Sequence, residues 1–98
     1  MILSERTIWQ VWEKGYVVPG NDPLMWRKDQ YGAWIFRRDY KNDLSEYGWE
    51  IICVNPEMNK IDDVWNLAPL NCKNTKRNSD LKPNSHVTAQ GIHNCVVQ

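Results

Sequence analysis

Six tryptophans spread along the chain constrain its fold more than any other feature of the sequence. They stand at positions 9, 12, 26, 34, 49 and 65 of 98 residues, and four tyrosines accompany them. Such large side chains bury much apolar area per residue, so we expect most tryptophans in the core. Their spacing does not predict a stacking platform. With 42% hydrophobic and 24% charged residues, the chain is predicted to fold as one small domain over residues 1–98.

The positive and negative charges of the chain are equal in number. The sequence contains twelve Lys and Arg residues and twelve Asp and Glu residues, so the formal net charge is zero. The chain lacks the overall positive field of non-specific nucleic-acid binders, and binding of duplex DNA is expected to be weak and confined to a local patch. No stretch approaches the roughly 18 apolar residues of a membrane span, and the opening MILSERTIWQ lacks the pattern of a signal peptide. We expect a soluble cytoplasmic protein with no membrane partner.

The cysteines and histidines predict neither a disulfide framework nor a metal site. Cys53, Cys72 and Cys95 are odd in number and far apart, and no Cys-x-x-Cys pair is present. His86 and His93 are seven residues apart, which differs from the helical spacings that bring two imidazoles onto one metal. We therefore expect no metal and no cofactor, and we expect both histidines to be surface or hydrogen-bonded residues.

The first third of the chain predicts one helix, an ordered loop and one strand. Ser4 is a helix N-cap residue before the apolar pattern of ERTIWQVWEK, which predicts a short helix over residues 5–14. Two prolines and a Gly-Asn-Asp cluster then predict an ordered loop over residues 16–29, held in place by Trp26. The β-prone run YGAWIFRRD predicts a strand or extended segment over residues 31–39.

The middle of the chain predicts two further strands. The run WEIICV has the composition of a buried strand over residues 49–54. Asp62 or Asp63 is expected to cap a single helical turn. Residues 67–70 then predict an edge strand, because Pro69 cannot donate to a sheet ladder.

The last third of the chain is more polar. NCKNTKRNSD predicts a short exposed helix over residues 71–80. In the tail, residues 81–98, apolar residues surround a turn at Gln90 and Gly91, and this pattern fits either a small hairpin or a wrapped terminal segment. The expected fold class is α+β.

Four short motifs in residues 26–80 are the most specific features of the chain: GAWI at 32–35, SEYGWEI at 45–51, the DD-x-x-NLxPL run from Asp62 to Leu70, and Lys-Arg-x-Ser-Asp at 76–80. Through these motifs, residues 26–80 resemble the bacterial HNH endonuclease family. VWEKG near the start and PNSHVTAQG in the tail look like extensions found around such modules. The resemblance implies a ββα-metal core, in which a two-stranded hairpin and a helix grip one divalent ion, with a flanking N-terminal helix.

The resemblance also implies that the catalytic positions have been replaced. In the family an Asp-His pair follows the Trp-Glu-Ile, where the Asp binds metal and the His is the general base. Those positions are Ile52 and Cys53 here, and the helix ligand position is Thr75. Isoleucine offers no lone pair to a hard cation, and cysteine suits zinc or copper better than magnesium. We therefore expect a vestigial site without catalytic residues, in which Ile52 and Cys53 complete a core.

Two functional alternatives for these positions stay open. Cys53 could act as a nucleophile or an unusual ligand, although a buried cysteine in an apolar strand is normally inert. Glu50, Asp62 or Asp63 could rebuild a metal site, although acidic residues in turns are more often caps.

Two basic clusters are the candidate phosphate or partner contacts. Arg37, Arg38 and Lys41 form the first. Lys73, Lys76 and Arg77 form the second, on the segment that the resemblance places along the minor groove of DNA.

The resulting hypothesis is a catalytically inactive HNH-like protein that binds another macromolecule in a bacterial or phage-infected cell. We expect this macromolecule to be a protein. An inhibitor or immunity factor of a nuclease system would fit this class by analogy. The alternative is a metal-dependent HNH endonuclease or nickase with substituted ligands, or a DNA-binding remnant of one.

Overall fold

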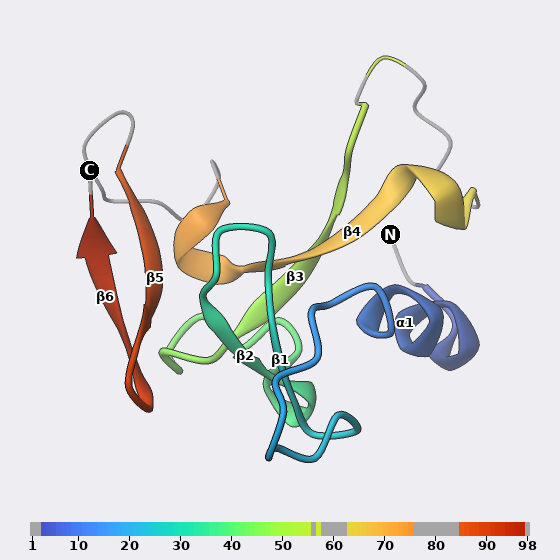
Figure 1. Ribbon diagram of the computed structural model, residues 1–98. Coiled ribbons are helices and arrows are strands. Elements are labelled where there is room, and N and C mark those ends of the chain that lie inside the picture. Colours follow the sequence, from blue (N-terminus) through green and yellow to red (C-terminus); the bar gives the residue numbers. More distant parts are fainter. Residues whose placement is uncertain (1–2, 56, 58–62, 76–84, 98) are drawn as a thin grey trace.

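The structure, a computed structural model, describes residues 3–55, 57, 63–75 and 85–97. Within them lie one α-helix and three antiparallel strand pairs, β1–β2, β3–β4 and β5–β6 (Figure 1). The elements are α1 (Glu5–Trp12), β1 (Trp26–Lys28), β2 (Trp34–Phe36), β3 (Trp49–Cys53), β4 (Leu67–Asn71), β5 (His86–Gln90) and β6 (His93–Val97). Short 3-10 turns occupy Arg37–Asp39 (η1), Val64–Asn66 (η2) and Cys72–Asn74 (η3). The expected small α+β domain with an N-terminal helix is confirmed.

Helix α1 is stabilised by an N-cap residue at its start and by an apolar face that packs into the core. The Ser4 hydroxyl accepts a hydrogen bond from the Thr7 N–H at 3.1 Å, which satisfies a donor that the helix leaves open. Ile8, Val11 and Trp12 are buried on the same side of the helix. The helix ends at Trp12, two residues before the predicted end.

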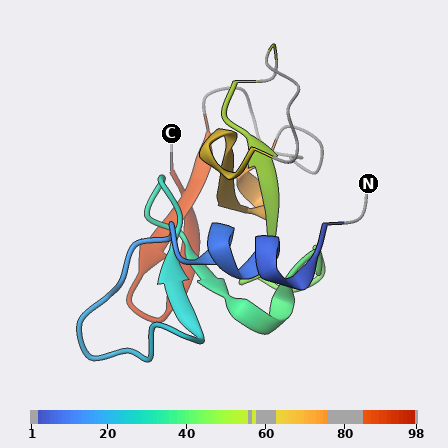
Figure 2. The same ribbon diagram turned by 90° about the vertical axis from the view of Figure 1, so that its right-hand side faces the viewer.

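The apolar core joins α1 to β3. Ile8, Trp12, Ile35 and Trp49 form one buried cluster, and the rings of Trp12 and Trp49 lie 5.1 Å apart. Figure 2 shows α1 crossing one end of β3. The prediction that most tryptophans are buried is confirmed for these two and for Trp34, whereas Trp65 is 91% exposed.

The prediction of a loop over residues 16–29 is wrong at its end, because Trp26–Lys28 is a strand. It pairs with β2 in the register Lys28↔Trp34. Strand β2 is also shorter than the predicted 31–39, since Gly32, at φ +84°, turns the chain before it and η1 follows it. A three-residue strand has too little local pattern to be recognised, because its partner supplies the hydrogen bonds.

The β3–β4 pair confirms both strands predicted in the middle of the chain. Its register places Ile51 opposite Pro69 and Cys53 opposite Leu67. The Asp63 carboxylate accepts a hydrogen bond from the Trp65 N–H at 3.1 Å and caps η2, as one of the two alternatives predicted. Asp62 lies outside the described residues.

The prediction of a helix over residues 71–80 is wrong for its first half. Asn71 still belongs to β4, and η3 is a single 3-10 turn. At Thr75 the backbone is extended, with φ −87° and ψ 147°. Residues 76–80 lie outside the described residues, so the helix that the HNH resemblance implies stays a prediction for them.

The tail is a hairpin, which confirms one of the two predicted arrangements. Strands β5 and β6 pair from His86↔Val97 to Gln90↔His93. Gly91 occupies the turn at φ +63°, a conformation that favours glycine. No helix in the described part of the chain is long and apolar enough to cross a membrane.

Candidate functional site

The three positions that the HNH resemblance assigns to a vestigial site lie at two ends of the β3–β4 pair. Ile52 and Cys53 are half-buried neighbours on β3, opposite Ala68 and Leu67. Strand β4 then runs away from them, and Thr75 follows η3 at the end of the pair where β3 begins (Figure 1).

The side chains at the expected helix ligand position hold the local structure. The Thr75 hydroxyl is buried and donates to the Cys72 carbonyl at 2.8 Å. The neighbouring Asn74 amide donates to the carbonyl of Val87 at 3.0 Å and accepts from its N–H at 2.7 Å. Asn74 therefore connects η3 to strand β5.

The acidic residues that could rebuild a metal site lie on different elements of the structure. Glu50 is buried on β3, while Asp63 caps η2. Among the described residues, no three His, Cys, Asp or Glu side chains are grouped as metal ligands. Cys53 and Cys95 are free thiols.

Arg37 is not available as a phosphate contact, in contrast to the sequence expectation. Its side chain is 10% exposed, and Nη2 pairs with the Glu5 carboxylate at 2.7 Å. The guanidinium lies 4.3 Å from the centroid of the Trp9 ring. Arg37 therefore ties η1 to helix α1.

Three of the other five basic residues of the two clusters belong to the described part of the chain, and two do not. Arg38 and Lys41 are exposed after β2, and Lys73 is half-buried in η3. Lys76 and Arg77 lie outside the described residues, so the second basic cluster stays a prediction.

Asp29 is the centre of a buried polar network that the sequence did not predict. One carboxylate oxygen accepts from the N–H groups of Tyr31 and Ala33, and the other accepts from the Asn71 N–H and the Asn74 amide. Four donors thus compensate the burial of a side chain that is 1% exposed. We call Asp29, Asn71 and Asn74 the Asp29 network.

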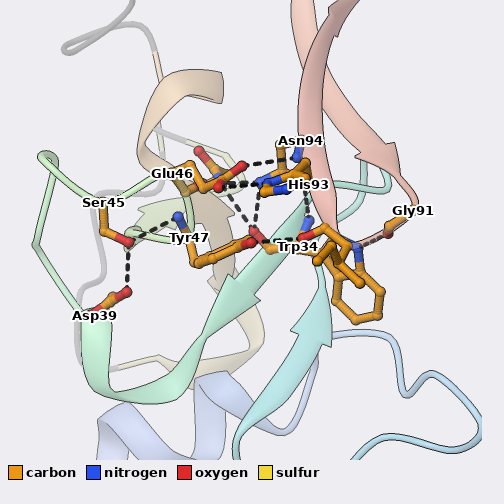
Figure 3. A network of polar contacts seen from close by, with 10 residues as sticks. Trp34, Asp39, Ser45, Glu46, Tyr47, Gly91, His93 and Asn94 are labelled. Atoms are coloured by element: carbon orange, nitrogen blue, oxygen red, sulfur yellow. Dashed lines mark hydrogen bonds and ion pairs between the residues drawn. The ribbon is translucent and has the colours of Figure 1, made fainter.

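A second set of polar contacts attaches the β5–β6 hairpin (Figure 3). The Asn94 amide accepts from the Trp34 N–H at 2.7 Å and donates to the Trp34 carbonyl at 3.0 Å. Glu46 accepts from the Asn94 N–H at 3.1 Å and pairs with the His93 ring at 3.0 Å. We call Trp34, Glu46, Tyr47, His93 and Asn94 the hairpin clamp.

The hairpin clamp shifts the titration of Glu46. The Asn94 N–H stabilises the ionised carboxylate most strongly, and His93 adds to this effect, so the pKa of Glu46 lies below its ordinary value of 4.5. Partial burial opposes the shift without cancelling it.

An aromatic pocket lies beside the hairpin clamp. It has a volume of about 410 Å³ and is lined by Asn21, Trp26, Trp34, Tyr47 and Ile92. The Trp26 ring is nearly perpendicular to the Trp34 ring, at 85°, and to the Tyr47 ring, at 88°. The β1–β2 pair brings Trp26 and Trp34 onto one face, where their rings meet edge to face.

The polar ends of two pocket rings are bound to the hairpin turn. The Trp34 indole N–H donates to the Gly91 carbonyl at 2.7 Å, and the Tyr47 hydroxyl donates to the Ile92 carbonyl at 2.7 Å. Ring carbon, rather than these polar atoms, is therefore what the pocket offers to a ligand. The Lys28 ammonium lies 4.8 Å from the centroid of the Trp34 ring.

Comparisons with known proteins found no relative of this chain. No protein-family model matches the sequence, and neither the curated proteins nor the solved structures contain a match. The function is therefore argued from the geometry of this chain and from the resemblance of its motifs.

Proposed function

We propose that this chain is a non-catalytic binding protein on an HNH-like scaffold, which acts by holding another macromolecule. The observation that supports the proposal best is the use of the former ligand positions for structure. The Thr75 hydroxyl closes η3 through the Cys72 carbonyl, and Ile52 extends the β3–β4 pair opposite Ala68.

The chemistry of the replaced positions supports the same proposal. Metal-assisted hydrolysis of a phosphodiester needs ligands for a hard cation and a base that activates water. Ile52 provides neither function, and the thiol of Cys53 is a soft ligand. A nuclease would need a new ligand set from other residues.

A protein is the partner that we expect. The net charge is zero, and Arg37 is engaged by Glu5, which reduces the basic surface near β2. Large apolar side chains are also exposed, among them Leu44 at 96% and Trp65 at 91%. Tryptophan is enriched in protein interfaces relative to the rest of the surface, so Trp65 is a candidate contact.

Cleavage of supercoiled plasmid tests the proposal. We expect no nicking or linearisation with magnesium, manganese or nickel, beyond that of an identical preparation from cells without the gene. A folded sample, shown by its circular dichroism, makes this result informative. Metal-dependent cleavage that disappears in Cys53→Ala or in Thr75→Val would contradict the proposal and support the endonuclease alternative.

Binding of duplex DNA separates a protein binder from a DNA-binding remnant. We expect weak binding that charge reversal at Lys73, Lys76 and Arg77 leaves nearly unchanged. A remnant would instead bind with a steep salt dependence, and its slope would fall by about 0.9 for each phosphate contact removed. That second result would move the protein into the DNA-binding class.

A further inference from the structure

We infer that the aromatic pocket binds a nucleotide, with the planar base among the rings of Trp26, Trp34 and Tyr47 and the phosphate near Lys28. The inference goes beyond the proposed function, because the pocket shares no residue with the vestigial site. The ligand is either a free nucleotide or an unpaired base of single-stranded nucleic acid, since both present the same chemistry.

The ring arrangement favours a planar aromatic ligand over an aliphatic one. Trp26 stands nearly perpendicular to both Trp34 and Tyr47, with ring centroids 6.1 and 5.0 Å away. A flat ring that enters such a pocket meets faces and edges at once, which are the two contacts that aromatic pairs prefer. A volume of about 410 Å³ falls in the range of small-molecule sites.

One cation lies close enough to the pocket to meet a phosphate at its rim. Lys28 lines the neighbouring pocket beside Asp29, but its ammonium lies 4.8 Å from the centroid of the Trp34 ring, so it would attract a phosphate and repel a second cation. The Glu46 carboxylate keeps its negative charge and is hydrogen-bonded to His93 and Asn94. In Figure 3 the Trp34 indole extends toward Gly91, away from that carboxylate.

The polar groups of the pocket suit the edge of a base. Asn21 lines the pocket, and its side-chain amide carries both a donor and an acceptor, as the hydrogen-bonding edge of a base does. The indole N–H of Trp34 and the hydroxyl of Tyr47 are bound to backbone carbonyls, so they are not offered to a peptide backbone. This arrangement argues against an extended proline-rich peptide as the ligand.

The pocket is held in its binding shape by the hairpin clamp. Asn94 fixes both backbone polar groups of Trp34, and the Ser45 hydroxyl accepts from the Tyr47 N–H at 3.1 Å. A pocket whose walls are already ordered loses little conformational entropy when the ligand enters.

Titration with adenosine monophosphate tests the inference, with adenosine as the probe that lacks phosphate. We expect saturable shifts of the Trp26 and Trp34 indole N–H resonances. Trp26→Leu should weaken binding by more than about tenfold, because base stacking on an aromatic ring is lost. The matched control is Tyr31→Leu, at an exposed aromatic residue that does not line the pocket, and it should leave binding unchanged.

The contact between Lys28 and the phosphate is tested with the variant Lys28→Ala, and Arg6→Ala is its control. Lys28→Ala should weaken binding of the monophosphate by about twofold to fivefold and leave adenosine unaffected, as expected for one exposed charge pair. Arg6 is an exposed cation of α1, so its removal should change neither affinity. Equal loss in both variants would contradict the role of Lys28.

A short single-stranded oligodeoxyadenylate distinguishes the two sources of the ligand. If it competes more strongly than the monophosphate, the ligand is an unpaired base, and if it competes no better, the ligand is a free nucleotide. The corresponding duplex should not compete, because its bases are stacked.

Three outcomes would overturn the inference. The first is an absence of saturable shifts at millimolar monophosphate and oligonucleotide. The second is nucleotide binding that persists in the folded Trp26→Leu variant. If Trp26→Leu does not fold, persistence of binding in both Ile92→Ala and Asn21→Ala counts as this outcome. The third is tighter binding of N-acetyltryptophanamide than of nucleotide, insensitive to Lys28→Ala, which would assign the pocket to a protein side chain.

Discussion

The α1–β3 side of the molecule and its β5–β6 side are stabilised by different interactions. On the first side, Trp12 and Trp49 pack with Ile8 and Ile35 in an apolar cluster. On the second side, the hairpin is attached through amides and carboxylates, with Asn94 and Glu46 as the main contacts. Packing of the first kind depends mainly on buried area, whereas contacts of the second kind depend on exact donor and acceptor positions.

This difference has a consequence for function. The aromatic pocket lies on the polar side, where two of its rings are held by hydrogen bonds to the hairpin turn. Small changes in the hairpin clamp are therefore expected to alter the pocket without unfolding the α1–β3 core.

The largest expected effect is at the apolar core. Trp12→Ala removes a side chain with no exposed surface and leaves a cavity, so we expect a loss of about 3–5 kcal/mol in the free energy of unfolding. Urea denaturation measures this loss. Trp65→Ala is the matched control and should change stability by less than about 0.5 kcal/mol. Similar losses at both positions would contradict the assignment of the core.

The Asp29 network gives the next largest effect. Asp29→Asn replaces one acceptor oxygen by an amide that faces the donors of Asn71 and Asn74. A buried donor left without a partner costs about 1–3 kcal/mol, so we expect a loss of about 2–3 kcal/mol in the free energy of unfolding. A stable Asp29→Asn variant would show that this network is not needed for the fold.

A substitution in the hairpin clamp is expected to destabilise the hairpin side of the molecule and to leave helix α1 unchanged. Asn94→Ala removes the acceptor of the Trp34 N–H and one of the two amide donors to the Trp34 carbonyl, the other being Asn71, at a cost of about 1–2 kcal/mol. Hydrogen exchange of the Trp34 amide should accelerate while that of the α1 amides stays near the wild-type rate. Asn42→Ala, in an exposed turn, is the control. Equal acceleration across both regions would show that the two sides unfold together.

The smallest expected effect is the acid sensitivity of the hairpin clamp. The pKa of Glu46 is lower in the folded protein, so its contribution is present above the ordinary pKa of 4.5 and is lost as the pH falls through the folded value. The pair is largely exposed, so this contribution is below about 1 kcal/mol after solvent screening. Melting of wild type and Glu46→Gln should differ at neutral pH and converge in acid. A gap that is constant with pH would exclude this role of Glu46.

The parts of the fold that were predictable have strong local patterns. Ser4 and the apolar face around Trp12 mark α1, and WEIICV marks β3. Pro69 marks an edge strand, as observed for β4. Strand β1 was not predictable, because three residues after a proline-rich loop carry no period and their pairing partner determines the structure.

The polar networks and the pocket were not predictable for a different reason. Asp29 and Asn71 are 42 residues apart in sequence, and Trp34 and Asn94 are 60 apart. Such contacts depend on the folded arrangement, and a single sequence carries no signal that connects them. The vestigial positions were found only through the HNH resemblance, and their loss of function stays a prediction.

Thermal melting with divalent cations tests the proposal that Ile52, Cys53 and Thr75 form no metal site. A ligand that binds only the folded state at a hundred times its Kd stabilises by about 2.7 kcal/mol, which raises the Tm of a domain this size by about 10 °C or more. We expect an unchanged Tm in millimolar magnesium or manganese. A reproducible rise of several degrees, reversed by chelator, would contradict it.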